Sequence, residues 1–265
     1  HMSTGLEHDE LGRRTEDNMN FGDPSVPRIM GQFAGAVAGM RQAGEALTFP
    51  VVSGNVSLYN QTGERPVQPT PTVGGVGLLR DHARMANIAP PPGASLVLIG
   101  ETRGHLGQSL YLREIDGREA GPPPPVDPGA ERAAGELVRR LIAGGTVAAC
   151  HDVSDGGLAV AVAEMALAGG VGARVEPPPE GANHAWLFGE DQGRYCVATH
   201  DPAAVQAAAR AAGVPAATIG ATGGESLNLP GGEAISVHAL RRAHEAWLPA
   251  FMAGTAPDAG DDTAW

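Results

Sequence analysis

The stretch TVAACHDVSDGGLAVAVAEMALAGG, residues 146–170, decides the class of fold. It opens with a short apolar run, 146–150, which has the length and composition of a buried strand. A loop of small and acidic residues follows at 151–157, and an alanine-rich run at 158–168 favours a helix. A strand that passes through a glycine-containing loop directly into a helix is the repeating unit of α/β proteins.

The same alternation extends to both sides of this stretch. Ile29, Phe33, Val37 and Met40 recur at spacings of three and four residues, which predicts a helix near the start of the chain. The run Pro90-Pro91-Pro92-Gly93 predicts a domain boundary. The sequence therefore predicts an α/β or α+β chain in two parts. Further strands are expected over 49–52, 70–79, 95–99, 172–175, 195–199, 218–221 and 234–237, and further helices from about 109 and over 130–143, 202–212 and 239–252.

The composition excludes several classes of function. The chain has 265 residues, 42% of them hydrophobic and only 4% aromatic, so we expect a core of small aliphatic side chains. All 18 basic residues are arginine, which excludes a P-loop lysine and a Schiff-base lysine. The formal net charge is −12 and there is no basic run, so we expect no nucleic-acid partner.

The cysteines and the hydropathy pattern indicate the cellular compartment. Cys150 and Cys196 are the two thiols of the chain, and we expect both to be reduced and buried in a cytoplasmic protein. No segment reaches the roughly 18 consecutive apolar residues of a membrane-spanning helix, so we expect no membrane partner. His1-Met2 has the form of an expression scar and is left out of the fold prediction.

Three loops have the composition of an anion-binding turn. They are GETRGHLGQS at 100–109, HDVSDGG at 151–157 and SGNVS at 53–57. Backbone N–H groups in such loops, and helix N-termini after them, attract phosphate. Each loop also fits an ordinary turn or helix cap, so together they favour phosphate chemistry without establishing it.

Smaller polar clusters supply further candidate ligands. Asp17-Asn18 would offer oxygen ligands to Mg²⁺ or form an Asx-turn. The cluster at 190–192, Glu-Asp-Gln, would bind a polar substrate or form a turn between strands. His105 and His151 lie in glycine-rich loops and are candidate site residues, although the nine histidines have no metal-binding spacing.

A series of longer motifs resembles one enzyme family. The motifs, in order, are DNMNFGDP, FPVVSGNVSLYNQT, PTPTVGGVGLL, GETRGHLGQSLYLRE, PPPPVD, HDVSDGGLAVAVAEMA and LFGEDQGRY, followed by the terminal segment RRAHEAWLPAFMAG. They resemble phosphoribosylformylglycinamidine synthase, in its synthetase subunit, within the aminoimidazole-ribonucleotide-synthetase-like superfamily. The resemblance runs from about Asp17 to Gly254 and so covers most of the chain. SGNVSLYN and GEDQGRY favour this family over aminoimidazole ribonucleotide synthetase and selenophosphate synthetase.

The resemblance implies a fold and a set of domain bounds. The implied fold is a partial A-type domain followed by a B-type domain of the aminoimidazole ribonucleotide synthetase-like fold. The expected bounds are 15–90 for the A-type, ATP-binding part and 91–252 for the B-type domain. Residues 1–14 would be a tag or an unmatched leader, and 253–265 a disordered acidic tail.

The resemblance also implies a reaction. The family is an ATP-dependent carbon–nitrogen ligase of purine biosynthesis, which converts formylglycinamide ribonucleotide and glutamine-derived ammonia to formylglycinamidine ribonucleotide, with ATP yielding ADP and phosphate. Such phosphoryl transfer requires Mg²⁺ and precise positioning of the reactants. The implied partners are a glutaminase and small accessory subunits of the synthase.

Four residues of this sequence match positions with known roles in that family. Asp17 and Gly54 match contacts to ATP, Asn55 matches a Mg²⁺ ligand, and Ser57 matches a contact to the substrate. The residue types suit these roles, because glycine permits close backbone approach and an amide oxygen suits a hard cation. The family's catalytic histidine lies in a region that this sequence does not match, so we expect no catalytic residue in this chain.

The extent of the match leads to two hypotheses. The family has two homologous halves, and this chain resembles only the later part of the second A-type domain and the second B-type domain. We therefore expect no synthetase activity from the chain alone, and we expect the edges of an incomplete sheet to pair with another copy as a homo-oligomer. The alternative is a non-catalytic nucleotide-binding or scaffold module derived from the same family.

Overall fold

The computed structural model describes residues 14–79, 81–178 and 181–255, and every structural statement below refers to these residues. They form two compact units, one that ends at Ala83 and one that begins at Arg84. Within the described residues, no helix has both the length and the apolar character needed to cross a membrane. The expected domain bounds, 15–90 and 91–252, stay a prediction, and most of the expected leader and tail lies outside the described ranges.

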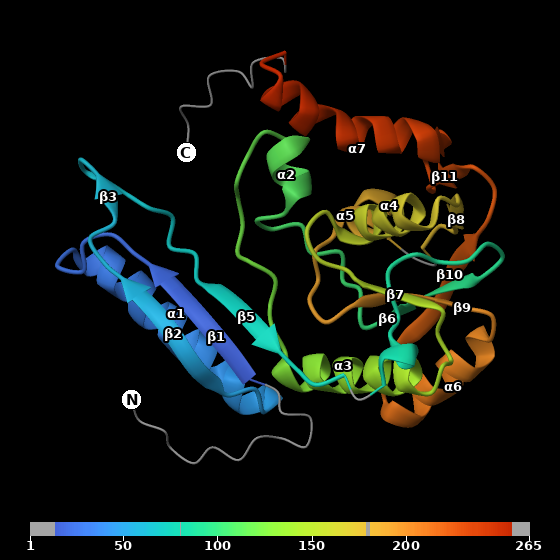
Figure 1. Cartoon of the computed structure of the whole chain (residues 1–265), viewed down its shortest axis with the longest axis horizontal. Coiled ribbons are helices and arrows are strands. Elements are labelled where there is room, and N and C mark those ends of the chain that lie inside the picture. Colours follow the sequence, from blue (N-terminus) through green and yellow to red (C-terminus); the bar gives the residue numbers. More distant parts are fainter. Residues whose placement is uncertain (1–13, 80, 179–180, 256–265) are drawn as a thin grey trace. The chain divides into compact units, whose positions relative to one another are not determined.

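The first unit is a three-stranded sheet with a long helix along one face (Figure 1). The central strand pairs in parallel with one neighbour and antiparallel with the other. The helix begins at Pro27, where proline is favoured because its missing N–H would have no helical partner. Met19, Phe21 and Ile29 are buried between helix and sheet. The elements are β1 (Arg14–Asn20), α1 (Pro27–Leu47), β2 (Val51–Ser57), β5 (Thr72–Val76) and the small hairpin β3 (Gln61–Thr62) with β4 (Arg65–Pro66).

Two sequence-based expectations about the first unit were wrong. The strand predicted over 49–52 does not end before the polar cluster, because β2 runs through it and each residue from Ser53 to Ser57 pairs with β1. The residues of β2 are largely exposed, and β2 forms an edge of the sheet. Asp17-Asn18 forms no Asx-turn, because both residues lie within β1.

The second unit is a seven-stranded sheet with helices on both faces (Figure 1). Its pairings are antiparallel except for the parallel pair β8–β11. The predicted mixed α/β fold class is confirmed. In spatial order the strands are β12 (Ile235–Ser236), β11 (Ser226–Asn228), β8 (Ala173–Val175), β10 (Ala216–Thr222), β6 (Ser95–Ile99), β9 (Tyr195–Thr199) and β7 (Ala149–Asp152). The helices are α2 (Leu110–Glu114), α3 (Pro128–Ala143), α4 (Gly157–Gly169), α5 (Asn183–Phe188), α6 (Pro202–Ala212) and α7 (Val237–Met252), and a short 3-10 turn covers His82–Arg84.

The sheet of the second unit separates two hydrophobic cores. Strand β6 contributes to both, with Leu96 and Leu98 in the core that contains α4, and Val97 and Ile99 in the core that contains α3 and α6. This division follows from the alternation of side chains along a strand. A strand that is buried on both faces reads as a continuous apolar run, which explains the sequence SLVLI.

Candidate functional site

The four residues that the family resemblance assigns to ATP, metal and substrate lie on two adjacent strands of the first unit. Asp17 belongs to β1, and Gly54, Asn55 and Ser57 belong to β2. Asp17 is paired directly with Gly54, while Asn55 and Ser57 are paired with the next polar residues of β1. The parallel pairing of these strands thus gathers residues from two separate motifs, and their individual roles stay a prediction.

Alternation along the strands divides these four residues between the two faces of the sheet. Successive strand residues point to opposite faces, and residues paired across neighbouring strands share a face. Asp17 and Gly54 lie on the face covered by α1, where Asp17 lines a cavity together with Met40. Asn55 and Ser57 lie on the opposite face. A ligand in contact with all four would have to reach around the edge strand β2.

The face that carries Asn55 is a row of amide side chains. Asn55 Nδ2 donates to Asn18 Oδ1 at 3.1 Å, and Asn20 Nδ2 donates to the same oxygen at 3.2 Å. The Asn55 amide oxygen is not used in this bond, so it suits Mg²⁺ as one neutral ligand. Asp17 points to the opposite face of the sheet, so Asp17 and Asn18 cannot bind the same ion. The described residues also contain no cluster of three or more acidic, histidine or cysteine side chains that would hold a metal.

The first predicted anion-binding loop of the second unit holds a carboxylate of its own chain. Asp191 accepts hydrogen bonds from the backbone N–H groups of Arg103, at 2.9 Å, Gly104, at 2.8 Å, and His105, at 3.3 Å. Its side chain is buried, and these charge-assisted bonds offset the cost of removing the carboxylate from water. The loop therefore binds an anion, as its composition predicted, but the anion is internal.

The second predicted loop has the same arrangement. Glu190 Oε1 accepts from the backbone N–H of Gly156 at 2.8 Å and from that of Leu110, the first residue of α2, at 2.9 Å. One carboxylate oxygen thus joins the loop at 100–109 to the loop at 151–157. Glu190 and Asp191 therefore form a framework for these loops, a role that was not predicted from the sequence, and the segment connects helix α5 to strand β9 rather than two strands.

A buried arginine completes this framework. Arg194 is 2% exposed, and its guanidinium donates to the backbone oxygens of Gly189 and Asp191 and to the Thr102 hydroxyl. Burial lowers the pKa of Arg194 below its ordinary value, and the nearby charges of Asp191 and Glu190 oppose that shift. The sequence offered no signal for this role, because a single arginine after a turn is usually exposed.

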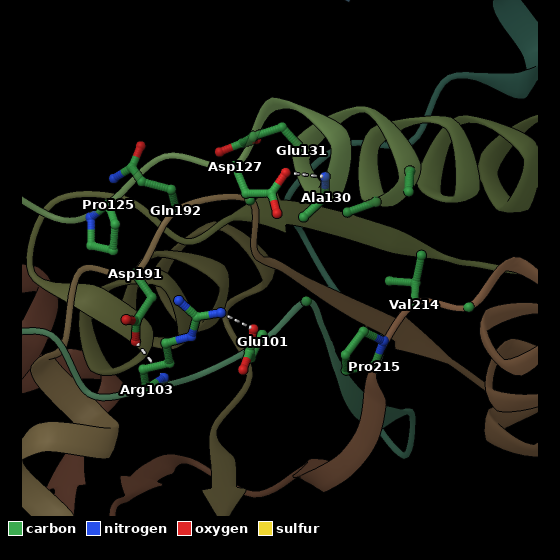
Figure 2. A pocket seen from close by; sticks show the side chains of 15 residues that line it. Glu101, Arg103, Pro125, Asp127, Ala130, Glu131, Asp191, Gln192, Val214 and Pro215 are labelled. Atoms are coloured by element: carbon green, nitrogen blue, oxygen red, sulfur yellow. Dashed lines mark hydrogen bonds and ion pairs between the residues drawn. The ribbon is translucent and has the colours of Figure 1, made fainter.

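A cavity of about 320 Å³ lies beside this framework, and its lining is acidic (Figure 2). Arg103, its one cationic side chain, is paired with Glu101 at 2.6 Å. Asp127 caps α3 by accepting from Gly129 and Ala130. Burial raises the pKa of the Glu131 carboxyl, which also faces the cavity. Such a lining repels phosphate, so this hollow does not suit a nucleotide's phosphate groups.

The two candidate histidines hold structural positions. His151 lies between two carboxylates, with Nδ1 3.1 Å from Asp152 Oδ1 and Nε2 2.9 Å from Glu164 Oε2. The Ser154 hydroxyl donates to Asp152 rather than to the imidazole, so these residues do not form a nucleophilic triad. His105 Nε2 lies 3.0 Å from the backbone oxygen of Pro122 and connects its loop to the proline-rich segment.

The two cysteines are free thiols, as predicted. Cys196 is buried and Cys150 is half-buried. Burial raises the pKa of Cys150 to about 11 and that of Cys196 to about 12. Neither thiol has the thiolate character that a catalytic or metal-binding cysteine requires.

Comparisons with known proteins identify the family. Residues 91–229 match the family model described as "AIR synthase related protein, C-terminal domain". Phosphoribosylformylglycinamidine synthase subunit PurL of Nitrobacter hamburgensis is 53% identical over 248 residues, which are 92% of this chain and 33% of the relative. The subunit PurL of Methylocella silvestris is 54% identical over 246 residues, 92% of this chain and 34% of the relative.

Solved structures share the fold at low sequence identity. Thermotoga maritima PurL complexed with FGAR has a TM-score of 0.66 at 19% identity, over 86% of this chain and 39% of that chain. Thermotoga maritima PurL complexed with ATP has a TM-score of 0.64 at 18% identity, over 86% and 37%. E. coli HypE, a hydrogenase maturation protein, has a TM-score of 0.59 at 19% identity, over 84% and 72%.

The curated relatives carry the same protein name, and each is covered to a similar share of its length. The chain spans about a third of the length of the curated relatives that it matches. The predicted resemblance, which rested on motifs throughout the chain, is confirmed by this identity over nine tenths of its residues. The chain belongs to the AIR synthase related family, and within it to the homologues of phosphoribosylformylglycinamidine synthase subunit PurL.

Proposed function

We propose that this chain contributes ATP, metal and substrate contacts to an ATP-dependent carbon–nitrogen ligase. The reaction is the conversion of formylglycinamide ribonucleotide to formylglycinamidine ribonucleotide, with ammonia from glutamine and with ATP yielding ADP and phosphate. The observation that carries the proposal is the direct pairing of Asp17 with Gly54 beside Asn55 and Ser57 on β1 and β2. The 53% identity to a PurL subunit over 92% of this chain supports the choice of reaction.

Each of the four residues has a role that its chemistry supports. Asp17 and Gly54 contact ATP, and glycine leaves space there because a Cβ at position 54 would overlap the Asp17 carboxylate. Asn55 supplies an amide oxygen to Mg²⁺, which when bound neutralises charge on phosphate oxygens. The Ser57 hydroxyl, half-buried beside Asn60, contacts the substrate. We propose these as contacts that bind and orient the reactants, with no general acid or base among them.

We further propose that the reaction requires the rest of the relatives' length. Only about a third of that length corresponds to this chain, and the described residues hold no cluster of side chains that would bind a metal by themselves. The expected partners are that remaining part, a glutaminase and small accessory subunits, and the expected location is the cytoplasm. The structure of PurLQS from Thermotoga maritima is among the solved structures similar to this chain, and this supports association with further subunits.

One observation favours the alternative function for the second unit. Glu190 and Asp191 occupy the loop N–H groups that would otherwise bind phosphate. A unit whose anion-binding loops are filled by its own carboxylates is suited to a scaffold role. In the alternative, therefore, the second unit is a non-catalytic module that holds the assembly together.

A reconstitution experiment tests the proposed function. The chain is purified alone and together with a polypeptide that supplies the part of the Nitrobacter hamburgensis relative that it does not cover. Formylglycinamidine ribonucleotide formation is then measured with ATP, Mg²⁺ and ammonia. We expect product only from the combination, and at least a ten-fold loss in Asn55→Ala. Asn228→Ala, an exposed amide in β11 of the second unit, is the matched control.

Each result of the reconstitution decides one part of the proposal. Product from the chain alone would overturn the requirement for the rest of the relatives' length. Full activity of Asn55→Ala in the combination would overturn the metal-binding role. Calorimetry of the chain with Mg-ATP separates the two functions further, because a scaffold without a nucleotide site would show no binding.

A further inference from the structure

The last helix, α7, carries one continuous row of core-type positions. Val237, Leu240, His244, Trp247 and Phe251 follow one another at alternating spacings of three and four residues. Residues with this spacing lie along one side of a helix, and such a side is usually buried against a neighbouring element. This row, the seam of α7, is therefore expected to be covered along its whole length.

The first half of the seam is covered by the second unit itself. Val237 is buried, and Leu240 packs against the core that contains α4. The guanidinium of Arg241 donates to the backbone oxygen of Leu167, near the end of α4. These contacts attach α7 to the unit along its first turns and end at about Arg241.

The second half of the seam is exposed. Trp247 is 52% exposed and Phe251 56%, and beside them Leu248 is 60% and Met252 76% exposed. Figure 1 shows that this end of α7 extends beyond the end of α4. The two aromatic rings stack on each other, with their centroids 5.0 Å apart. The four side chains together expose roughly 500 Å², which is as large as the largest apolar patch on a typical monomer.

The charge pattern of this segment suits contact with a second copy of itself. The whole chain has a formal net charge of −12, so most contacts between two copies bring like charges together. Residues 243–252 carry one formally charged side chain, Glu245, when histidine is counted as neutral. Glu245 is already paired with Arg241 of the same helix, at 2.9 Å. Two copies of the segment can therefore approach each other without repulsion between unpaired charges.

We propose that residues 244–252 of α7 bind the same segment of a second copy of this chain. The two helices pack antiparallel about a two-fold axis that passes near Leu248, the middle residue of the segment. Such a contact uses one self-complementary patch twice. The proposal is independent of the proposed function, because α7 contains none of the residues assigned to ATP, metal or substrate.

The area of the contact decides its strength. Two copies of the patch bury about 1,000 Å² in total, which is the lower limit for a specific interface. We therefore expect a reversible dimer with a dissociation constant of about 1–100 µM rather than a permanent one. Trp247 and Phe251 lie at the centre of the patch, where aromatic side chains contribute most of the binding free energy.

Sedimentation equilibrium of the complete 265-residue chain, between about 1 and 300 µM, measures this dimer. Trp247→Gln and Phe251→Gln each remove an aromatic ring from the patch. Val126→Gln is the matched control, because Val126 is an exposed apolar residue of the second unit outside α7. Val76→Asp places a charge on the edge strand β5 and tests pairing through the sheet edges of the first unit.

The expected results follow from the position of each residue. Trp247→Gln and Phe251→Gln each weaken the dimer at least about ten-fold. Val126→Gln and Val76→Asp leave the dissociation constant unchanged. The urea midpoint of Trp247→Gln, measured well below the dissociation constant, equals that of the unaltered chain, which shows that the weaker association does not come from a damaged fold.

Disulfide trapping tests the antiparallel geometry. Leu248→Cys places a thiol beside the two-fold axis, so oxidation with copper phenanthroline should link two copies. His238→Cys is the control, because it lies nearly three turns earlier on α7 and its two copies would be about 30 Å apart. The unaltered chain controls for Cys150 and Cys196, which are half-buried and buried.

Four results would overturn the proposal. A chain that stays monomeric up to about 300 µM does not pair through α7. A dimer that is lost in Val76→Asp but kept in Trp247→Gln and Phe251→Gln pairs through the sheet edges. A monomeric chain that binds the polypeptide used in the reconstitution, with weaker binding in Trp247→Gln, has its patch covered by that polypeptide instead. A dimer without a disulfide in Leu248→Cys has a different geometry.

Discussion

Glu190 Oε1 lies 2.8 Å from the backbone nitrogen of Gly156 and accepts its hydrogen bond. The same oxygen accepts from the N–H of Leu110, so one carboxylate joins the two glycine-rich loops of the second unit. Together with Asp191 and Arg194 it makes these loops part of one internal hydrogen-bond network. The candidate ligand contacts lie instead on the strand pair β1–β2 of the first unit.

The first prediction concerns the stability of this network. Asp191→Ala removes a buried carboxylate and leaves the N–H groups of Arg103, Gly104 and His105 without their acceptor. We expect the free energy of unfolding to fall by about 2–4 kcal/mol, measured by urea denaturation. Glu176→Ala, at an exposed carboxylate, should change it by less than about 0.5 kcal/mol. Equal effects of the two substitutions would contradict the role of Asp191.

The second prediction concerns the glycine that opens α4. Gly157 has a φ of +69°, and a Cβ there would lie 2.7 Å from the Gly189 oxygen and 2.8 Å from the Leu187 oxygen. Gly157→Ala should therefore cost about 2–4 kcal/mol of unfolding free energy, from backbone strain and overpacking together. Gly170→Ala is the control, because its φ is +62° but nothing lies within 4 Å of the added Cβ.

The comparison between the two glycines isolates the steric contribution. Gly170→Ala should cost only about 1 kcal/mol, since strain is then the sole penalty. Thermal denaturation of both variants under the same conditions gives the difference. If Gly157→Ala were no more destabilising than Gly170→Ala, the close approach of the turn after α5 to the start of α4 would be wrong.

The third prediction tests the pairing of Asp17 with Gly54. Gly54→Ala places a methyl group where the Asp17 carboxylate lies, so it should both destabilise the first unit by about 1–3 kcal/mol and weaken Mg-ATP binding. In Gly54→Ala/Asp17→Ala the obstructing carboxylate is gone. A double-mutant cycle should therefore show a favourable coupling of at least about 1 kcal/mol in stability, without recovery of binding. Additive stability effects would contradict the steric relationship.

The fourth prediction concerns alkaline pH. The pKa values of Cys150 and Cys196 are raised to about 11 and about 12 by burial, above the ordinary value of 9.0. Between pH 9 and 11 the unfolded chain loses its thiol protons while the folded chain keeps them, so the free energy of unfolding falls as the pH rises. At pH 10 each thiol should account for a loss of about 1 kcal/mol relative to pH 7.

Urea denaturation at the two pH values checks this prediction. The variant Cys150→Ala/Cys196→Ala should lose less stability between pH 7 and pH 10 than the unaltered chain. Iodoacetamide should also modify the folded chain at pH 8 about 100-fold more slowly than the urea-unfolded chain, because the thiolate fraction is smaller. An identical pH dependence of the two proteins would show that the cysteines are not responsible.

Several elements were predictable because their signals are local. The strand at 95–99 and the helix at 202–212 have the predicted bounds, and α4 differs from the predicted helix by one residue at each end. Periodicity, caps and breakers near each element are sufficient for such predictions. The helix α5 and the strand β11 were missed, because short elements carry little periodicity and depend on their neighbours in the fold.

The sequence by itself determined the alternation of strands and helices, the family resemblance and the composition of the anion-binding loops. Only the tertiary structure decided which anion those loops bind, because Glu190 and Asp191 reach them from residues distant in the chain. It also decided that Asp17 and Asn55 point to opposite faces of the sheet. The face on which a strand residue lies depends on how the strands pair and on the face against which α1 packs. Local patterns specify backbone conformation, whereas the partner of each polar group is set by contacts between distant residues.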